Sequence, residues 1–326
     1  MTDSLHWKNA VTEAYNRVSS SALPPYQTAL ELSPFFSANH HCHIHLKYEH
    51  MQRTGSFKYR GALNKLLSLT EAQRQAGIVT ASSGNHGMAC AQAAAGLNID
   101  ATVFVPESAS EFKVAQITRL GANVVPVKGD CLVAEMQAME IAASQQKTYI
   151  SPYNDAAVIA GQGTIAVELE QQLPDLDAVF IAVGGGGLVG GVGSYLKAKH
   201  PHIDIIGCWP ETACAMSQCL DAGEIIEVDE LPTLSDGTAG NVEPGSITFE
   251  LCQDVIDKKV MVSEAQIATV IQQMAEHERQ IIEGAAAVAI AGAVKLSGDY
   301  DHKNVAVIVC GRNIAYSTFK RTIQSP

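Results

Sequence analysis

The residues Ala178-Val179-Phe180-Ile181-Ala182-Val183-Gly184-Gly185-Gly186-Gly187-Leu188 carry a short apolar run directly into four glycines. An uninterrupted apolar run is typical of a strand that is buried on both faces of a sheet. Four glycines let successive N–H groups face one point, and the helix expected from Leu188 adds partial positive charge there. The stretch therefore predicts a strand, a phosphate-binding turn and a helix. A turn that serves packing alone is the alternative.

The same alternation of short apolar runs and helical patterns continues in both directions from this stretch. Further strands are expected at residues 44–48, 77–81, 101–105, 123–127, 203–208 and 305–309. Helices are expected at residues 5–19, 61–69, 85–96, 131–145, 188–200, 211–221, 263–279 and 284–296, and another begins at Ser110. This order is typical of βαβ units with parallel strands. We therefore expect an α/β protein with open, mostly parallel, twisted sheets flanked by helices.

The length and the breaks in the pattern suggest how the chain is divided. A chain of 326 residues is long enough for two domains. Proline and asparagine interrupt the pattern at residues 148–154, where we expect a crossing between domains. The longest stretch without periodicity is residues 231–245, which contains three glycines and two prolines. Long irregular loops of this kind commonly contribute to functional sites.

Composition excludes several classes of partner. The net charge of −12 opposes binding to nucleic acid or to an anionic membrane surface. We find neither a signal-peptide core nor an apolar run of the ~20 residues that a membrane helix needs. The eight cysteines lack C-x-x-C spacing and are expected to be free thiols in a reducing compartment. These features predict a cytoplasmic protein that acts on a small molecule.

Lys58 is the candidate nucleophile. It lies in the stretch Thr54-Gly55-Ser56-Phe57-Lys58, just before the helix expected from Gly61. Thr54 and Ser56 are residue types that cap helices, and apolar residues at 57, 63, 66 and 67 predict one buried face. Burial near a helix N-terminus lowers a lysine's pKa, so the free amine can form a Schiff base. A surface lysine at the top of a helix is the alternative.

Two further turns carry polar groups to the ends of expected strands. Ser82-Ser83-Gly84-Asn85-His86-Gly87 follows one strand, and its N–H and hydroxyl groups can hold a carboxylate. Asn85 can also donate a hydrogen bond to a phenolic or carbonyl oxygen. Cys310-Gly311-Arg312-Asn313 follows the last strand, where ligands bind in open α/β sheets. An ordinary capped helix and a core cysteine are the respective alternatives.

A histidine-rich segment offers a second kind of site. Its members lie within eleven positions: His40, His41, Cys42, His43, His45 and His50. Alternate histidines on a strand share one face and could bind zinc. However, Lys47 would repel a cation, and no acidic residue lies between the histidines. We favour a solvated edge strand and predict no metal there.

The motifs at residues 54–58, 82–87, 160–164, 184–188 and 310–313 resemble, in order and spacing, those of pyridoxal-phosphate enzymes of the tryptophan-synthase β type, also called fold-type II. The resemblance covers residues 23–321 and is strongest to the serine/threonine dehydratase and serine racemase branch. The further stretches 235–239, 245–249 and 282–285 resemble catabolic dehydratase-like members. It implies a large cofactor-anchoring domain, residues 1–66 and 151–326, and a small substrate-binding domain, residues 67–150. It also implies pyridoxal 5′-phosphate as the cofactor and a homodimer.

The resemblance also assigns roles to residues. Lys58 would form the Schiff base with the cofactor and remove the substrate's α-proton. The turn from Gly184 to Leu188 would hold the phosphate. Other cofactor contacts would come from Asn85 at O3′, Cys310 at the pyridine nitrogen, and Phe57 and Gly237 at the ring faces. The substrate carboxylate would be bound by Ser82, Ser83, Gly84, Asn85 and His86. Ser83 would also be the acid or base on the face opposite Lys58.

The implied activity is an ammonia-lyase reaction, in which L-threonine, L-serine or a related 3-hydroxy amino acid yields a 2-oxo acid and ammonia by α,β-elimination. The alternatives are an amino-acid racemase, a dehydratase for a bulkier substrate such as 3-hydroxyaspartate or a product of hydroxyectoine breakdown, and a non-catalytic sensor that keeps the pocket. The chain departs from many relatives at Cys310, where serine is common, and at Arg312, where glycine is common. Trp209 and Ala215 replace acidic metal ligands, so no metal is predicted there unless Glu211 substitutes.

Overall fold

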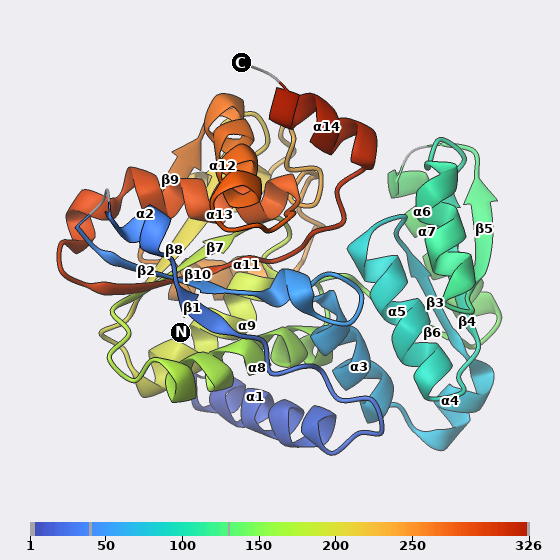
Figure 1. The fold of residues 1–326 in the computed structure, drawn as a ribbon. Coiled ribbons are helices and arrows are strands. Elements are labelled where there is room, and N and C mark those ends of the chain that lie inside the picture. The colour runs from blue at the N-terminus through green and yellow to red at the C-terminus, as the bar shows by residue number, and fades with distance from the viewer. Residues whose placement is uncertain (1–3, 39–40, 130, 325–326) are drawn as a thin grey trace.

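The computed structural model describes residues 4–38, 41–129 and 131–324, and their strands form two separate sheets (Figure 1). The larger sheet has six strands in the order β1-β2-β10-β7-β8-β9. These strands span Leu30–Leu32, His43–Lys47, Asn304–Ile308, Ala178–Ala182, Asp204–Pro210 and Lys258–Val262. Every neighbouring pair is parallel except β1 and β2. The expected α/β class and mostly parallel sheets are therefore confirmed.

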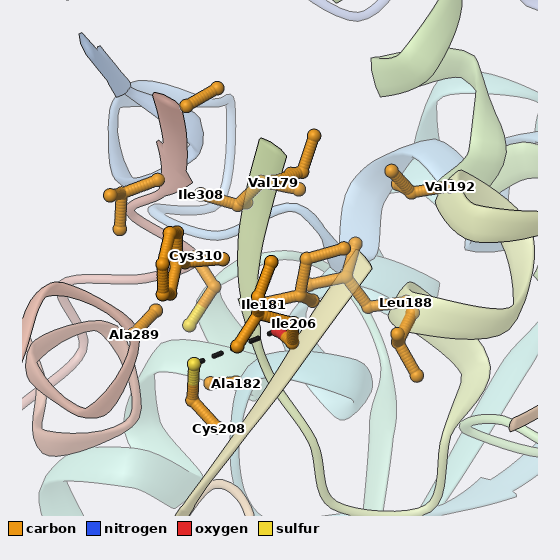
Figure 2. Close-up of a cluster of buried hydrophobic side chains, with 14 of the residues drawn as sticks. Val179, Ile181, Ala182, Leu188, Val192, Ile206, Cys208, Ala289, Ile308 and Cys310 are labelled. Carbon is orange, nitrogen blue, oxygen red and sulfur yellow. Dashed lines mark hydrogen bonds between the residues drawn. The ribbon is translucent and has the colours of Figure 1, made fainter. Parts of the chain in front are cut away.

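Helices cover both faces of the six-stranded sheet. One face carries α1 (Ser4–Ser19), α8 (Ala156–Gln172) and α9 (Gly187–Lys199), whereas α12 (Glu264–Glu276) and α13 (Gly284–Lys295) lie on the other (Figure 1). The strand β7 is buried along its whole length, as its apolar run predicts. Figure 2 shows side chains of β7 and β8 packing between those of α9 and α13.

The smaller sheet has four parallel strands in the order β5-β4-β3-β6. They span Asn123–Val127, Ala101–Pro106, Ile78–Ala81 and Thr148–Tyr149. Val103 and Val105 face α5 (Asn85–Gly96), and Phe104 faces α7 (Cys131–Ser144) on the opposite side. Both faces are thus buried, which explains why β4 reads as a continuous apolar run. The helices α4 (Glu71–Ala76) and α6 (Glu111–Arg119) complete this unit.

Several elements were not expected from the sequence. They are α8, β1, α2 (Pro34–Ala38), α4, β6, α11 (Ile247–Val255), β9, α14 (Tyr316–Gln324) and the 3₁₀ segments Glu49–Met51 and Ser297–Tyr300. The longest of them, α8, is buried from Val158 to Leu169, so it has no polar face to produce a helical period. The helix expected at 211–221 corresponds to α10 (Ala215–Ala222). It begins later than expected, and β8 before it continues to Pro210.

The start of the lysine helix differs from the prediction. Helix α3 spans Lys58–Ser68, and its N-cap is Phe57, which makes no side-chain cap bond. The predicted caps are wrong: the hydroxyls of Thr54 and Ser56 are buried without a hydrogen-bond partner. An isolated antiparallel bridge between Ser56 and Gly311 fixes this segment instead. The helix is also buried around most of its circumference, not along one face.

A buried cluster of four charges holds α3 against α8 and β2. Arg60 bonds Glu49 on one side (Nη2 to Oε1, 2.8 Å) and Glu168 on the other (Nη1 to Oε1, 2.7 Å). Lys47 also bonds Glu168, at 2.5 Å. All four side chains are at most 3% exposed. Because removing one member of such a cluster leaves a buried charge unpaired, we expect a loss of about 3–5 kcal/mol of stability.

Candidate active site

A cavity of about 910 Å³ lies between the two sheets, at the carboxyl ends of β3, β7 and β10. It is lined by Lys58 and by all the other residues predicted from the sequence to hold cofactor or substrate: Phe57, Ser82, Ser83, Gly84, Asn85, His86, Gly184, Gly185, Gly186, Gly187, Leu188, Gly237 and Cys310. The structure thus brings together segments that are up to 253 positions apart, from Phe57 to Cys310. Part of the irregular loop at 231–245 also lines it.

Lys58 is the first residue of α3, and its amine points into the fold. Nζ donates a hydrogen bond to the carbonyl oxygen of Pro152 at 2.8 Å. Burial lowers the pKa of Lys58 to about 8, although the thiols of Cys90 and Cys310 and the carboxyl of Glu283 act in the opposite direction. At pH 7 about a tenth of this amine is therefore uncharged and can attack a carbonyl carbon.

The glycine turn leaves no room for side chains. Gly186 is the N-cap of α9 with φ +86°, and an added Cβ would lie 2.7 Å from Sγ of Cys252. A Cβ on Gly185 would lie 2.4 Å from the ring of Tyr153. The hydroxyl of Thr248 donates to the Gly185 carbonyl oxygen at 2.6 Å and holds the turn in place. Bare N–H groups at a helix N-terminus fit the phosphate of pyridoxal 5′-phosphate.

The turn from Ser82 to His86 joins β3 to α5. Gly84 is the N-cap of α5 without a side-chain cap bond, and its N–H donates to Oγ of Ser82 at 3.2 Å. His86 is buried, and its Nε2 lies 3.1 Å from the carbonyl oxygen of Ile150. Burial, followed by the nearby Lys58, lowers the pKa of His86 to about 3, so the ring is neutral. The ring is therefore a fixed support for the turn.

Glu283 lies in the cavity wall and was not among the predicted site residues. Its carboxylate accepts hydrogen bonds from Nδ2 of Asn85, at 2.8 and 3.1 Å, and from the N–H of Asn313, at 2.9 Å. Burial raises the pKa of Glu283 to about 7, although these bonds lower it. The motif at residues 282–285 was one of the pieces that carried the resemblance, and it was the available signal for this residue.

Cys310 is held beside the lysine motif by main-chain bonds. The N–H of Phe57 donates to the Cys310 carbonyl oxygen at 3.1 Å, and the N–H of Arg312 donates to that of Gly55 at 2.9 Å. Burial raises the pKa of the Cys310 thiol well above its ordinary value, so it stays neutral. Arg312 has an exposed side chain whose Nη1 lies 3.2 Å from Sδ of Met51, at the rim of the cavity.

The histidine segment does not form an edge strand. β2 pairs with β1 on one side and β10 on the other, so the expectation of a solvated edge was wrong. His50 lies in the cavity wall, with Nε2 3.0 Å from Oε1 of Gln280, and His40 is outside the described residues. Within residues 4–38, 41–129 and 131–324, no group of three or more potential ligands could hold a metal ion. The same residues contain no helix that is long and apolar enough to cross a membrane.

Comparisons with known proteins agree with this geometry. The family of pyridoxal-phosphate dependent enzymes matches residues 22–311. An L-threonine ammonia-lyase of Thermotoga maritima is 39% identical over 299 residues, which are 91% of this chain and 74% of that protein.

Two solved structures have the same fold. Threonine deaminase isoform 2 of Solanum lycopersicum superposes with a TM-score of 0.90 at 33% identity, over 96% of this chain and 92% of that one. Maize serine racemase also superposes with a TM-score of 0.90, at 28% identity, over 97% and 96% of the two chains. Since the family match covers most of the sequence and the cavity has the glycine turn and buried lysine that the cofactor needs, this chain belongs to the pyridoxal-phosphate dependent enzymes, in the threonine dehydratase and serine racemase branch predicted from its motifs.

Proposed function

We propose that this protein is an ammonia-lyase that converts L-threonine, L-serine or a related 3-hydroxy amino acid to a 2-oxo acid and ammonia. The hydroxyl leaves Cβ as water, and a second water later replaces the nitrogen, so the reaction is balanced without an oxidant. The observation that carries the proposal is the buried amine of Lys58, which shares one cavity with the glycine turn and the Ser82–His86 turn. Relatives named threonine ammonia-lyase and threonine deaminase support the substrate class.

Each part of the cavity has a task in this proposal. Pyridoxal 5′-phosphate, when bound, withdraws electrons from Cα of the substrate and makes its proton acidic. Lys58 would hold the cofactor and would accept the α-proton of the substrate at Nζ. Gly184 to Leu188 would bind the phosphate, Asn85 would donate to the phenolic oxygen, and Cys310 would lie at the ring nitrogen. Phe57 and Gly237 cover the ring, and Ser82 to His86 bind the substrate carboxylate.

The division of the chain follows from these tasks. We propose that residues 1–66 and 151–326 form the cofactor-anchoring domain and that residues 67–150 form the substrate-binding domain. The contents of the two sheets support this division, since β3 to β6 all lie within residues 78–149. A cytoplasmic homodimer remains our prediction; the described residues form no disulfide, which is consistent with a reducing compartment.

A racemase is the second candidate, because Ser83 lines the same cavity as Lys58 and the fold matches a serine racemase. We favour elimination because the relatives of higher identity are named threonine ammonia-lyase and threonine deaminase, whereas the serine racemase is less similar. Cys310 would offer only a neutral thiol to the ring nitrogen of the cofactor. Ser83 has only a hydroxyl to deliver a proton on the face opposite Lys58.

The test is a substrate panel with two readouts. Purified protein is supplied with L-serine, L-threonine, threo-3-hydroxyaspartate and bulkier 3-hydroxy amino acids, and both the 2-oxo acid and the chirality of the amino acid are measured. Borohydride should fix the cofactor to Lys58, and Lys58→Ala should abolish turnover, whereas Lys128→Ala, at an exposed position, should not. A colourless protein that still converts amino acids would overturn the proposal, and so would D-isomer formation faster than 2-oxo acid formation.

A further inference from the structure

Glu283 has no task in the proposed function, yet it lines the same cavity. It is the N-cap residue of α13, but its side chain makes no cap bond to that helix. The residue is only 5% exposed, and its carboxylate turns towards Asn85 and Asn313 instead. A buried carboxylate with these partners joins the start of α5, the start of α13 and the segment after β10.

The surrounding backbone leaves space for this carboxylate. A Cβ on Gly311 would lie 2.3 Å from Oε1 of Glu283, so only glycine fits opposite it. A Cβ on Gly237, the residue predicted to lie on the cofactor face, would be 3.6 Å from the same oxygen. Oε1 therefore lies at the surface that would meet the cofactor. The main-chain N–H of Glu283 donates to the Gly311 carbonyl oxygen at 3.1 Å and fixes the spacing.

The network determines which way the Asn85 amide faces. Oδ1 of Asn85 accepts from Nδ2 of Asn313 at 2.6 Å, and Nδ2 of Asn313 also donates to the Thr54 carbonyl oxygen at 2.9 Å. With its oxygen committed, Asn85 directs its NH₂ group towards Glu283. Because both acceptor oxygens belong to one carboxylate, a single N–H points between them and the second N–H is left for the cavity.

We propose that Glu283 is a positioning residue that acts through Asn85, keeping an N–H donor and not a carbonyl oxygen aimed at the phenolic oxygen of the bound cofactor. The inference rests on the proposed cofactor site. A donor at this place stabilises the ionised phenolic oxygen, and a carbonyl oxygen would repel it. Glu283 thereby sets the ionisation of the cofactor without touching the substrate.

The decisive variant is Glu283→Gln, because it exchanges one acceptor for a donor at nearly constant volume. The main-chain N–H of Asn313 cannot rotate, so it keeps its hydrogen bond to the remaining side-chain oxygen at position 283. The new NH₂ group therefore faces Asn85, and the Asn85 amide must flip so that its oxygen accepts from that group. We expect the absorption of the bound cofactor, without substrate, to move from the visible to the near-ultraviolet. Cofactor affinity should fall at least about tenfold, the effect of losing one hydrogen bond to a charged group. Glu170→Gln, on α8 and outside the cavity wall, is the matched control and should keep both properties.

A double variant separates positioning from folding. In Glu283→Gln with Asn85→Asp, the carboxylate of residue 85 accepts from the new amide and from Asn313, so every hydrogen bond is matched again. We expect the thermal stability of the cofactor-free protein to recover while the absorption stays in the near-ultraviolet, because residue 85 no longer offers a donor. If Glu283→Gln does not fold, the same absorption of the bound cofactor is measured in the double variant instead.

Two results would overturn the inference. The first is a wild-type spectrum and affinity in Glu283→Gln, and the second is recovery of the visible band together with stability in the double variant. Wild-type protein that takes up no cofactor would overturn the proposed function first, which the wild-type spectrum alone reveals. All measurements are made on the full chain with pyridoxal 5′-phosphate as the added ligand.

Discussion

Two turns of the molecule connect a strand to a helix in the same way but differ in how much room they leave for a side chain. The Ser82–Gly84 turn follows β3 and starts α5, and the Gly184–Gly186 turn follows β7 and starts α9. Each helix begins after a glycine N-cap that makes no side-chain bond. Gly186 has φ +86° and close neighbours, whereas Gly84 has φ −111° and its Cβ would meet nothing nearer than 4.0 Å.

The difference indicates a division of work. The second turn is fixed by packing, so it can hold one constant group, the cofactor phosphate. The first turn is open and carries hydroxyl and amide side chains, so it can receive a ligand that comes and goes. Lys58 lies in the same cavity as both turns. Variants in the two turns should therefore fail in different ways.

The largest expected effect is at the packed turn. Gly186→Ala forces a left-handed φ on a residue with a side chain and pushes Cβ against Cys252. We expect a loss of about 2–4 kcal/mol in the free energy of unfolding and cofactor affinity at least about a hundredfold weaker, since the N–H groups no longer converge. Gly84→Ala is the control and should change stability by less than about 0.5 kcal/mol. Thermal melts and cofactor titrations measure the two effects. Equal losses in both variants would contradict the proposed difference between the two turns.

The open turn should control the stereochemistry more than the elimination. If Ser83 is the acid or base opposite Lys58, Ser83→Ala should reduce D-isomer formation at least about tenfold, as expected for losing such a group. Elimination from L-substrates should change by less than about threefold, because Lys58 still takes the α-proton. Chiral chromatography and a 2-oxo acid assay measure both rates. Loss of L-elimination as complete as in Lys58→Ala would contradict the lyase assignment.

Lys58 itself gives a smaller, pH-dependent effect. Burial lowers its pKa to about 8, so the uncharged amine increases as pH rises through that value. Uptake of pyridoxal 5′-phosphate by the cofactor-free protein should accelerate about fivefold from pH 7 to pH 8 and less than twofold above pH 8. An unshifted lysine would keep gaining beyond pH 10. Stopped-flow absorbance measures this rate, and Lys58→Ala should lack the phase.

No change is expected on removal of divalent cations. Trp209 is buried and has no oxygen ligand to offer, and Oε1 of Glu211 lies 3.9 Å from the ammonium of Lys295. A hard cation needs several oxygen ligands, and the described part of the chain has no group of three or more potential ligands that could hold one. Neither turn should therefore depend on a metal. Activity that falls on chelation at constant ionic strength and returns with Mg²⁺ would reverse this expectation.

Local signals in the sequence explain what could be predicted. The apolar runs of β3, β4, β5 and β7 and the glycines at 184–187 each announce their structure within a few residues. Helix α8 could not be recognised, because Gly161 and Gly163 pack α8 directly against α3, α1 and α9 and remove any polar face. A Cβ on Gly161 would lie 2.6 Å from Cα of Gly61. In α8 the glycines permit close packing between helices, although in the sequence they suggest a break in a helix.

Features that depend on contacts between residues far apart in the sequence could not be predicted. Glu283 acquires its role from Asn85, which is 198 positions away, and no local pattern marks that pairing. The false caps at Thr54 and Ser56 have the same origin, since a bridge to Gly311 fixes the start of α3. The predicted residues of the cavity could be named from the sequence because each of its turns has a local pattern of its own.

The buried charges around Arg60 constrain the order in which the protein assembles. Glu168 is 108 positions from Arg60, so Lys47 and Arg60 have only Glu49 to neutralise them until this long-range contact forms. A surplus positive charge opposes insertion of α3 into an apolar core. The strands of the smaller sheet all lie within residues 78–149, so they can pair before the contact with Glu168 forms. Pulse-labelled hydrogen exchange during refolding should show β3 and β4 protected before α3, so that the reactive amine is put in place among the last parts of the molecule.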